Sequence, residues 1–206
     1  MAAPETPRIY LVTPPEIELG RFADTLARVL DAHEVACLRL ALSTHDETAL
    51  ARAADACREV AHARDIAIVI DTHVVLAERL GLDGVHLTDG ARQVRAVRKA
   101  LGPDSVVGAF CGASRHDGLS AGEAGADYVS FGPVGDTALG MGARAERGIF
   151  EWWSQMIELP VVAEGALDEE IVRDLAPVTD FFAVGTEIWC EDDPAAALAR
   201  LIAAMP

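Results

Sequence analysis

Lysine is almost missing from this chain of 206 residues. Lys99 is the only lysine, so arginine supplies sixteen of the seventeen basic residues. Lys99 follows Val94 and Val97 in a stretch of helical periodicity, and no lysine ends a predicted strand. Because a Schiff-base aldolase needs a lysine in its active site, the sequence excludes that activity.

Paired cysteines and long apolar runs are also lacking. The first seven residues do not have the basic and then apolar order of a secretory signal, and no apolar run approaches the roughly 20 residues that cross a bilayer. We therefore expect a reduced, cytoplasmic protein with no membrane partner. The four cysteines form no CxxC pair and are Cys37, Cys57, Cys111 and Cys190.

Positive charge is scarce overall. The formal net charge is −16, and no cluster of arginines with interleaved aromatic residues offsets it locally. Such a chain repels polyanions, so we expect no nucleic-acid partner.

What the chain does have is a regular alternation of short β-branched runs with longer stretches of helical period. The runs are nearly continuous in apolar residues, as expected of strands buried on both faces of a parallel barrel. We predict an α/β protein with a TIM (β/α)₈ barrel as one domain over residues 1–206; an open, doubly wound sheet is the alternative. The predicted strands lie at 9–12, 35–40, 66–71, 83–87, 105–110, 127–131, 160–164 and 180–184.

One connection is unusually long and rich in glycine. Residues 132–148 contain five glycines and few apolar anchors, whereas most βα loops have only a few residues. We expect a lid loop here, in which Arg144 and Arg147 can bind phosphate.

Chemistry in such barrels sits at the carboxyl ends of the strands. An arginine inside a buried strand, Arg39, needs either an anionic ligand or an ion pair with Asp71 or Glu164. The two carboxylates are candidates for general acid/base groups or cation ligands, or they serve structural pairing alone. The polar or glycine residues that end the predicted strands are Thr13, Arg39, Asp71, His86, Gly132 and Glu164.

Three further positions carry open alternatives. His86, with Asp89 three residues on, either touches a metal or proton-transfer site or is a hydrogen-bonded core histidine, which we favour. Gly165 and Gly185, the latter followed by Thr186, either present backbone N–H groups to a phosphate or simply make tight turns. Because TIM barrels commonly bind phosphate after strands seven and eight, we favour the phosphate site.

Several strings of the sequence are similar to those of the thiamine-phosphate synthase and TenI family, and the similarity runs from about residue 8 to 190. The resemblance implies a TIM barrel that, in the synthase, joins a pyrimidine pyrophosphate to a thiazole phosphate with Mg²⁺ and releases pyrophosphate. TenI relatives instead aromatise the thiazole by tautomerisation. The matching strings are Ile9–Thr13, Gly84–Leu87, Gly125–Val129, Phe131–Val134 and Pro160–Ala163.

The chain departs from the family pattern at the charged positions. The family's Arg-Glu-Lys on strand two corresponds to Arg39–Ala41, so Ala41 replaces a pyrophosphate lysine. The family's carboxylates after strands three and four correspond to Thr72 and Ala91, which leaves Asp71 or Asp89 to hold Mg²⁺ with water.

Departures continue after strand six. The family's Thr-x-Thr-Lys corresponds to Thr137–Gly140, which keeps one hydroxyl and loses a second lysine. The family's Gly-Gly after strand seven keeps Gly165 alone, and Pro133 stands where TenI-type enzymes have a histidine. The expected catalytic residues are thus Arg39, Asp71 and Thr137.

Two functions follow from this comparison. The first is a synthase-like protein that binds a thiazole phosphate and couples it to a pyrimidine pyrophosphate. The second is a binding or regulatory barrel that keeps affinity for a phosphorylated small molecule without turnover. The sequence leaves a homo-oligomer open in both cases.

Overall fold

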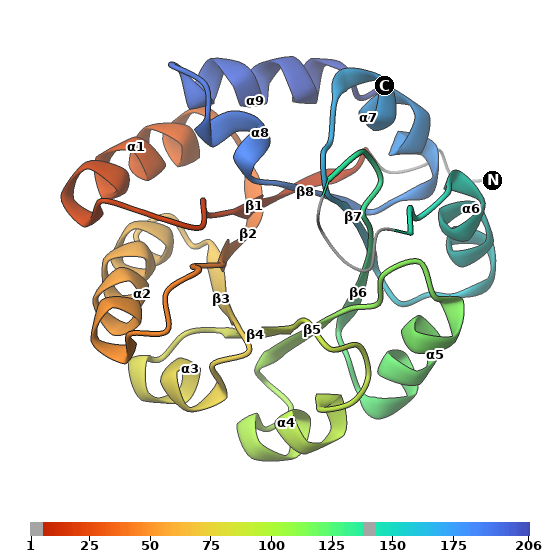
Figure 1. The fold of residues 1–206 in the computed structure, drawn as a ribbon, viewed down its shortest axis with the longest axis horizontal. Helices are drawn as coiled ribbons and strands as arrows, with labels where there is room; N and C mark the ends of the chain where they lie inside the picture. The colour runs from red at the N-terminus through yellow and green to blue at the C-terminus, as the bar shows by residue number, and fades with distance from the viewer. Residues whose placement is uncertain (1–5, 138–142) are drawn as a thin grey trace.

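The computed structural model describes residues 6–137 and 143–206 and forms a closed barrel of eight parallel strands inside a ring of helices (Figure 1). Each strand pairs with the next along the chain, and β8 pairs with β1. The predicted TIM barrel is confirmed, and an open sheet is ruled out. The strands are β1 Arg8–Val12, β2 Val35–Leu40, β3 Ala67–Asp71, β4 Gly84–Leu87, β5 Val106–Phe110, β6 Tyr128–Phe131, β7 Val161–Glu164 and β8 Phe181–Val184.

The helices follow the strands in sequence and cover the outside of the barrel. Several begin at a side chain that caps them: Asp46, for example, accepts hydrogen bonds from the backbone N–H groups of Thr48 and Ala49 at the start of α2. The α-helices are α1 Leu19–Ala32, α2 Glu47–His62, α3 Val74–Leu80, α4 Val94–Leu101, α5 Arg115–Ala124, α6 Arg147–Met156, α7 Glu169–Leu175, α8 Thr186–Trp189 and α9 Pro194–Ala203.

The sequence alternation predicted one helix after each strand, but β8 is followed by two. The short helix α8 has only four residues and precedes α9. A short extra helix at this place is a frequent part of TIM-barrel phosphate sites. No helix within the described residues is long and apolar enough to span a membrane.

Alternate residues of each strand face either the helices or the barrel interior. In β3, Ile68 and Ile70 belong to the large core between strands and helices, whereas Val69 belongs to a second apolar cluster inside the barrel. Asp71, two residues after Val69, therefore also faces inward, at the carboxyl end of the strand. The same period of two carries Arg39, His86 and Glu164 to that end.

At the amino-terminal end of the barrel, three aspartates make the same kind of hydrogen bond to the sheet. An aspartate just before β4, β6 and β8 accepts a hydrogen bond from a backbone N–H of the preceding strand, which satisfies a donor that the sheet leaves free. The three pairs, with N–O distances of 2.7, 2.7 and 2.8 Å, are Asp83 with Ile68, Asp127 with Val107 and Asp180 with Val161. Hydrogen bonds that stabilise the sheet thus lie at the amino-terminal end of the barrel, whereas the polar residues Arg39, Asp71, His86 and Glu164 lie at the carboxyl end.

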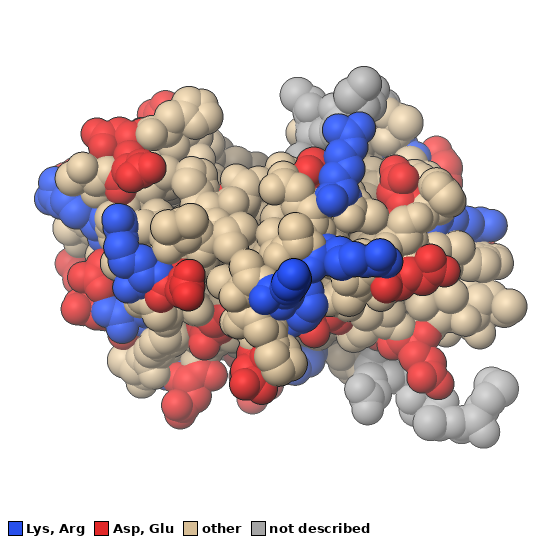
Figure 2. All heavy atoms as spheres, turned by 90° about the horizontal axis from the view of Figure 1, so that it is seen from below, with Lys and Arg blue, Asp and Glu red and all other residues tan. Residues whose placement is uncertain are grey.

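On the face shown in Figure 2, basic and acidic side chains are interspersed, and neither sign forms an extended patch.

Candidate active site

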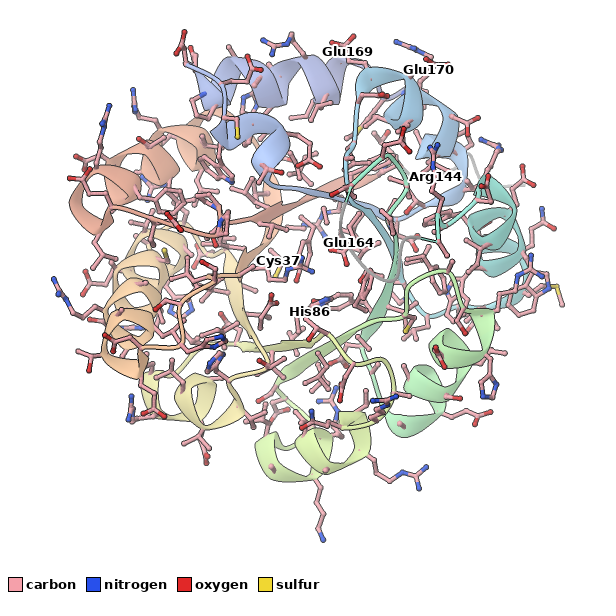
Figure 3. The ribbon with its side chains drawn as sticks, viewed as in Figure 1. Cys37, His86, Arg144, Glu164, Glu169 and Glu170 are labelled. Atoms are coloured by element: carbon pink, nitrogen blue, oxygen red, sulfur yellow. The ribbon has the colours of Figure 1, made fainter. Side chains whose placement is uncertain are left out.

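The candidate site is a polar cluster inside the carboxyl end of the barrel. Apolar side chains fill the interior below it, whereas Arg39, His86, Ser130 and Glu164 are buried there although they are polar. Figure 3 shows His86 and Glu164 projecting into the barrel interior, with Cys37 beside them, whereas Glu169 and Glu170 lie outside on α7. A buried group of this kind has to be internally paired or to meet a ligand.

Arg39 links three strands of the barrel. Its Nη1 lies 2.9 Å from Oε2 of Glu164 on β7, and its Nε lies 3.5 Å from Oδ1 of Asp71 on β3. The guanidinium carbon also lies 5.8 Å from the centre of the Tyr10 ring on β1. Of the ion pairs that the sequence left open for Arg39, the structure contains both.

Glu164 is the more deeply buried of the two carboxylates, with only 3% of its side chain exposed. Its Oε1 accepts a hydrogen bond of 2.9 Å from the hydroxyl of Ser130 on β6. Burial by itself lowers the pKa of Arg39, but Glu164 and Asp71 outweigh it and raise that pKa above its ordinary value. The guanidinium therefore stays charged and pairs with carboxylates of the protein itself.

Asp71 is the group here that titrates near neutral pH. Burial raises the pKa of its carboxyl from 3.8 to about 6, Arg39 opposes the rise, and Glu164 adds to it. Its Oδ1 is buried and accepts no hydrogen bond within the described part of the chain. Asp71 thus has the placement and the pKa of a proton donor or acceptor at the barrel mouth.

His86 is the hydrogen-bonded core histidine that we favoured. Its Nδ1 lies 3.0 Å from the hydroxyl of Tyr128, and 1% of the residue is exposed. Asp89, its expected companion, instead accepts a hydrogen bond from Gln93 and lines a separate cleft of about 980 Å³ over β4 to β6. The structure thus gives the two residues different surroundings.

Two strand-end residues support the barrel backbone. Thr13 is 3% exposed, and its hydroxyl accepts a hydrogen bond of 3.0 Å from the backbone N–H of Ala41. This hydroxyl therefore joins the ends of β1 and β2. Gly132 lies so close to β7 that a Cβ atom would come within 2.4 Å of the carbonyl oxygen of Glu164.

The expected phosphate position after β7 and β8 is already occupied by a carboxylate of the chain. Glu187 accepts a 2.7 Å hydrogen bond from the N–H of Gly185 and a 3.1 Å hydrogen bond from the N–H of Leu167. Gly165 has φ of 95°, and its carbonyl accepts the N–H groups of Val134 and Gly135. Sequence reasoning missed Glu187, which a phosphate bound at Gly185 has to displace.

Thr186 and Thr137 are exposed at this end of the barrel. Thr186 is the first residue of α8. Thr137 is the last described residue before the gap; Gly140, at the position of the family's second lysine, lies outside the described residues together with the rest of 138–142 of the expected lid.

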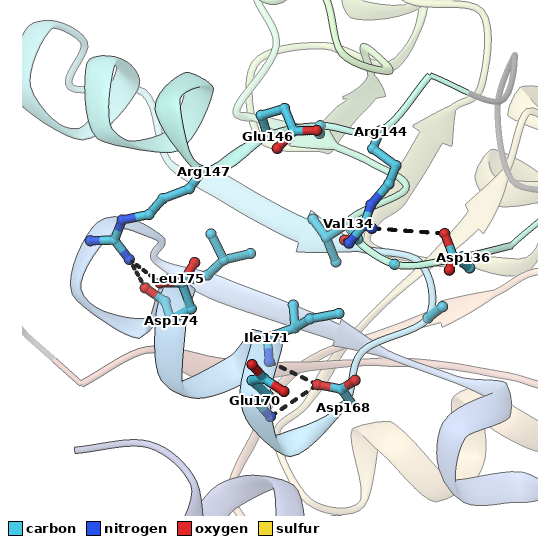
Figure 4. A pocket seen from close by; sticks show the side chains of 13 residues that line it. Val134, Asp136, Arg144, Glu146, Arg147, Asp168, Glu170, Ile171, Asp174 and Leu175 are labelled. Atoms are coloured by element: carbon cyan, nitrogen blue, oxygen red, sulfur yellow. Dashed lines mark hydrogen bonds and ion pairs between the residues drawn. The ribbon is translucent and has the colours of Figure 1, made fainter.

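The two arginines of the expected lid line a cleft of about 610 Å³ between the end of β6 and α7 (Figure 4). Arg144 is half-exposed; it donates a 2.6 Å hydrogen bond to the carbonyl of Val134 and lies 3.8 Å from Asp136. Arg147 begins α6 and makes ion pairs with Glu151 at 2.7 Å and with Asp174 at 3.0 Å. The guanidinium of Arg147 is thus paired with two carboxylates, and a phosphate bound by Arg147 would have to compete with them.

Few side chains among the described residues could bind Mg²⁺, the cofactor that the family resemblance implies. Residues 6–137 and 143–206 contain no group of three or more His, Cys, Asp or Glu side chains that could hold a metal. Asp71 and Asp89 each have one buried carboxylate oxygen without a hydrogen-bond partner in that part of the chain. One or two carboxylates do not form a protein cage, but they suit an ion held mainly by substrate phosphates and water.

Comparison with known proteins gives the family. The model described as "Thiamine monophosphate synthase" matches residues 9–188, from β1 to α8. This chain belongs to the thiamine monophosphate synthase family. A thiamine-phosphate synthase of Rhodospirillum centenum is 41% identical over 197 residues, covering 93% of this chain and 94% of the relative. One of Erythrobacter litoralis is 37% identical and covers 99% and 100%.

A solved structure of the thiamine phosphate pyrophosphorylase from Pyrococcus furiosus has the same fold, with a TM-score of 0.83, 19% identity and coverage of 96% and 94%. Membership of the thiamine monophosphate synthase family supports a role in thiamine biosynthesis for this chain. Within the family fold, the polar cluster around Arg39 lies at the catalytic end of the barrel.

Proposed function

We propose that this chain is a thiamine-phosphate synthase-like protein that binds a thiazole phosphate and a pyrimidine pyrophosphate at the barrel mouth and couples them slowly. The observation that carries the proposal is the position of Arg39, buried at the carboxyl end of the barrel with Asp71 beside it. Arg39 would contact the pyrophosphate, and Asp71 would take or give a proton.

Slow coupling follows from the charge of the mouth. A departing pyrophosphate needs cations aimed at its oxygens, and loss of one such group costs on the order of 10²–10³ in rate. Here one guanidinium faces two carboxylates of the protein, Glu164 and Asp71. With both ionised, the cluster has one positive and two negative charges, so little positive potential is left for a leaving group.

A monophosphate has a second place to bind, at the ends of β7 and β8. Backbone N–H groups near Gly165 and Gly185, with the Thr186 hydroxyl, would hold its oxygens. Glu187 has to move away first, because its carboxylate now accepts the Gly185 N–H. Arg144, half-exposed beside this region, is the lid arginine that would contact the phosphate.

Mg²⁺, when bound with the substrate, supplies positive charge to the pyrophosphate oxygens. Asp71 or Asp89 would hold it, through the carboxylate oxygen that has no hydrogen-bond partner among the described residues.

A binding or regulatory barrel without turnover is the second candidate. The pairing of Arg39 with Glu164 favours it, because a guanidinium that is already paired with a carboxylate of the protein binds an anionic ligand less well. Both candidates bind the precursors, and the turnover number separates them.

Binding at the mouth is tested by calorimetric titration with the pyrimidine pyrophosphate. Replacing Arg39 with lysine keeps the charge but removes the planar fork that contacts two groups at once. We expect Arg39→Lys to weaken binding at least tenfold, about 1.4 kcal/mol. The matched control is Arg8→Lys, since Arg8 begins β1 and lies over Phe181 at the opposite end of the barrel from Arg39. Equal affinities for the two variants would refute binding at Arg39.

A further inference from the structure

A hydrogen-bond chain crosses the barrel interior below Arg39, and the proposed function does not use it. The hydroxyls of Tyr10 on β1 and Tyr128 on β6 lie 2.6 Å apart, and Tyr128 in turn lies 3.0 Å from Nδ1 of His86 on β4. All three residues are buried. The chain therefore joins three strands without contact with bulk water.

The backbone is shaped to hold Tyr128 in this place. A Cβ atom on Gly108 of β5 would lie 2.0 Å from Cζ and 2.3 Å from the hydroxyl of Tyr128, so only glycine leaves room for the ring. The Tyr128 ring also stacks on His86, with ring centres 5.8 Å apart and planes 21° apart. The phenol thus has one position, with its hydroxyl against Nδ1.

The number of donors and acceptors left without a partner decides in which direction the hydrogen bonds between Tyr10, Tyr128 and His86 run. Within the described residues, neither tyrosine hydroxyl has a further partner, and Nε2 of His86 has none. If Tyr10 donates to Tyr128 and Tyr128 donates to Nδ1, only the Nε2–H is left without a partner. In the reverse direction, both the Tyr10 hydrogen and the Nε2 lone pair lack partners. The first arrangement is favoured, because each unsatisfied buried group costs about 1–3 kcal/mol.

The charge states agree with this direction. Burial lowers the pKa of His86 well below 6.5, and Arg39 lowers it further, so the imidazole is neutral. Burial raises the pKa of both Tyr10 and Tyr128, so both phenols keep their hydrogens. His86 therefore has one N–H, and Tyr128 fixes which nitrogen carries it.

We propose that Tyr10 and Tyr128 hold His86 as the Nε2–H tautomer, and that this N–H is a fixed hydrogen-bond donor to an uncharged acceptor atom of the substrate. The acceptor would be a heteroaromatic ring nitrogen or a hydroxyl oxygen. An anion is disfavoured at this N–H because the carboxylate of Asp71 is close by: Asp71 on β3 lies opposite His86 on β4 in the strand register. The Oδ1 of Asp71 also has no hydrogen-bond partner among the described residues. Tyr10 and Tyr128 are positioning residues that act through His86.

The tautomer is measured without any ligand, by long-range ¹H–¹⁵N correlation spectra of the full chain, with His86 assigned from the signal lost in His86→Gln. We expect the hydrogen on Nε2 in the wild type and in Tyr10→Phe, where Tyr128 still donates to Nδ1. In Tyr128→Phe no hydroxyl donates to Nδ1, so nothing fixes which ring nitrogen of His86 carries the hydrogen, and a mixture of tautomers is expected. A hydrogen on Nδ1 in the wild type would overturn the inference.

The ligand part rests on the proposed function and is tested with the pyrimidine pyrophosphate by calorimetry and by the His86 spectrum. In His86→Gln the amide nitrogen replaces Nε2, whereas in His86→Asn it lies near the former Nδ1. We expect binding within threefold of wild type in the first variant and at least tenfold weaker in the second. Binding without a shift of the Nε2–H signal would overturn the inference and leave the proposed function standing. No binding by the wild type would overturn both the ligand part and the proposed function.

Discussion

Replacing Glu164 with glutamine tests whether an internal carboxylate cancels the charge of Arg39. The amide keeps the size of the side chain and can still accept from Ser130, but it removes the negative charge 2.9 Å from Nη1 of Arg39. At an effective dielectric constant of about 20, two unit charges at this distance attract by roughly 6 kcal/mol. Asp71, at 3.5 Å, remains as a counter-charge, so only part of this attraction becomes available to a ligand.

We expect Glu164→Gln to bind inorganic pyrophosphate more tightly by the value of one charged hydrogen bond, about 1.5–3 kcal/mol, or roughly tenfold to a hundredfold. The variant should also unfold at lower denaturant concentration, because breaking a buried ion pair costs up to about 3–5 kcal/mol. Calorimetric titration measures the affinity, and circular dichroism shows that the protein is folded. The control is Glu169→Gln, at an exposed position on α7. Unchanged or weaker binding by a folded Glu164→Gln protein would refute the reasoning.

Three further predictions concern other carboxylates of the barrel. Glu187→Gln should tighten binding of inorganic phosphate about tenfold, because the Gly185 and Leu167 N–H groups lose a charged acceptor; equal affinity in a calorimetric titration would count against a phosphate site there. The carboxyl of Asp71 has a pKa of about 6 in the folded state against an ordinary value of 3.8, so the folded state binds more protons than the unfolded state and its stability falls as pH rises from about 4 to 6. Relative to Asp71→Asn, the wild type should lose up to about 3 kcal/mol of unfolding free energy across this window in urea titrations. Unfolding free energies of the two proteins that change in parallel with pH would contradict the shift. Asp127→Asn should cost about 1–2 kcal/mol of unfolding free energy, because the carboxylate holds both the Val107 N–H and Arg98; the exposed Asp104→Asn should stay within about 0.5 kcal/mol, and equal effects would refute the clamp.

The sequence predicted the barrel because its signals are local. Each strand is a short apolar run, and the observed bounds of β2 coincide with the predicted ones at 35–40. A period of two also places Arg39, Asp71 and Glu164 on the inward face, so their meeting at one end followed from the topology. The two-helix ending after β8 was not predicted, because α8 has only four residues, too few for a periodic signal.

The features of the site that the sequence did not predict depend on contacts that form only in the folded barrel. The ion pair of Arg147 with Asp174, on α7, joins residues that are far apart along the chain. Glu187 was missed because nothing local shows that its carboxylate turns back onto the Gly185 N–H. The Tyr10 and Tyr128 pair was within reach of the alternation argument, which places both side chains in the interior, but their contact needs the closed barrel and the space at Gly108.

The central claim is that the barrel mouth binds both precursors but cannot stabilise departing pyrophosphate well, because its buried guanidinium is matched by internal carboxylates. The steady-state turnover number of the purified chain with Mg²⁺, the pyrimidine pyrophosphate and the thiazole phosphate tests this most directly. We predict a value below about one per second, with both precursors bound in separate titrations. A turnover number within the usual enzymatic range of roughly 1–10³ per second would contradict the claim.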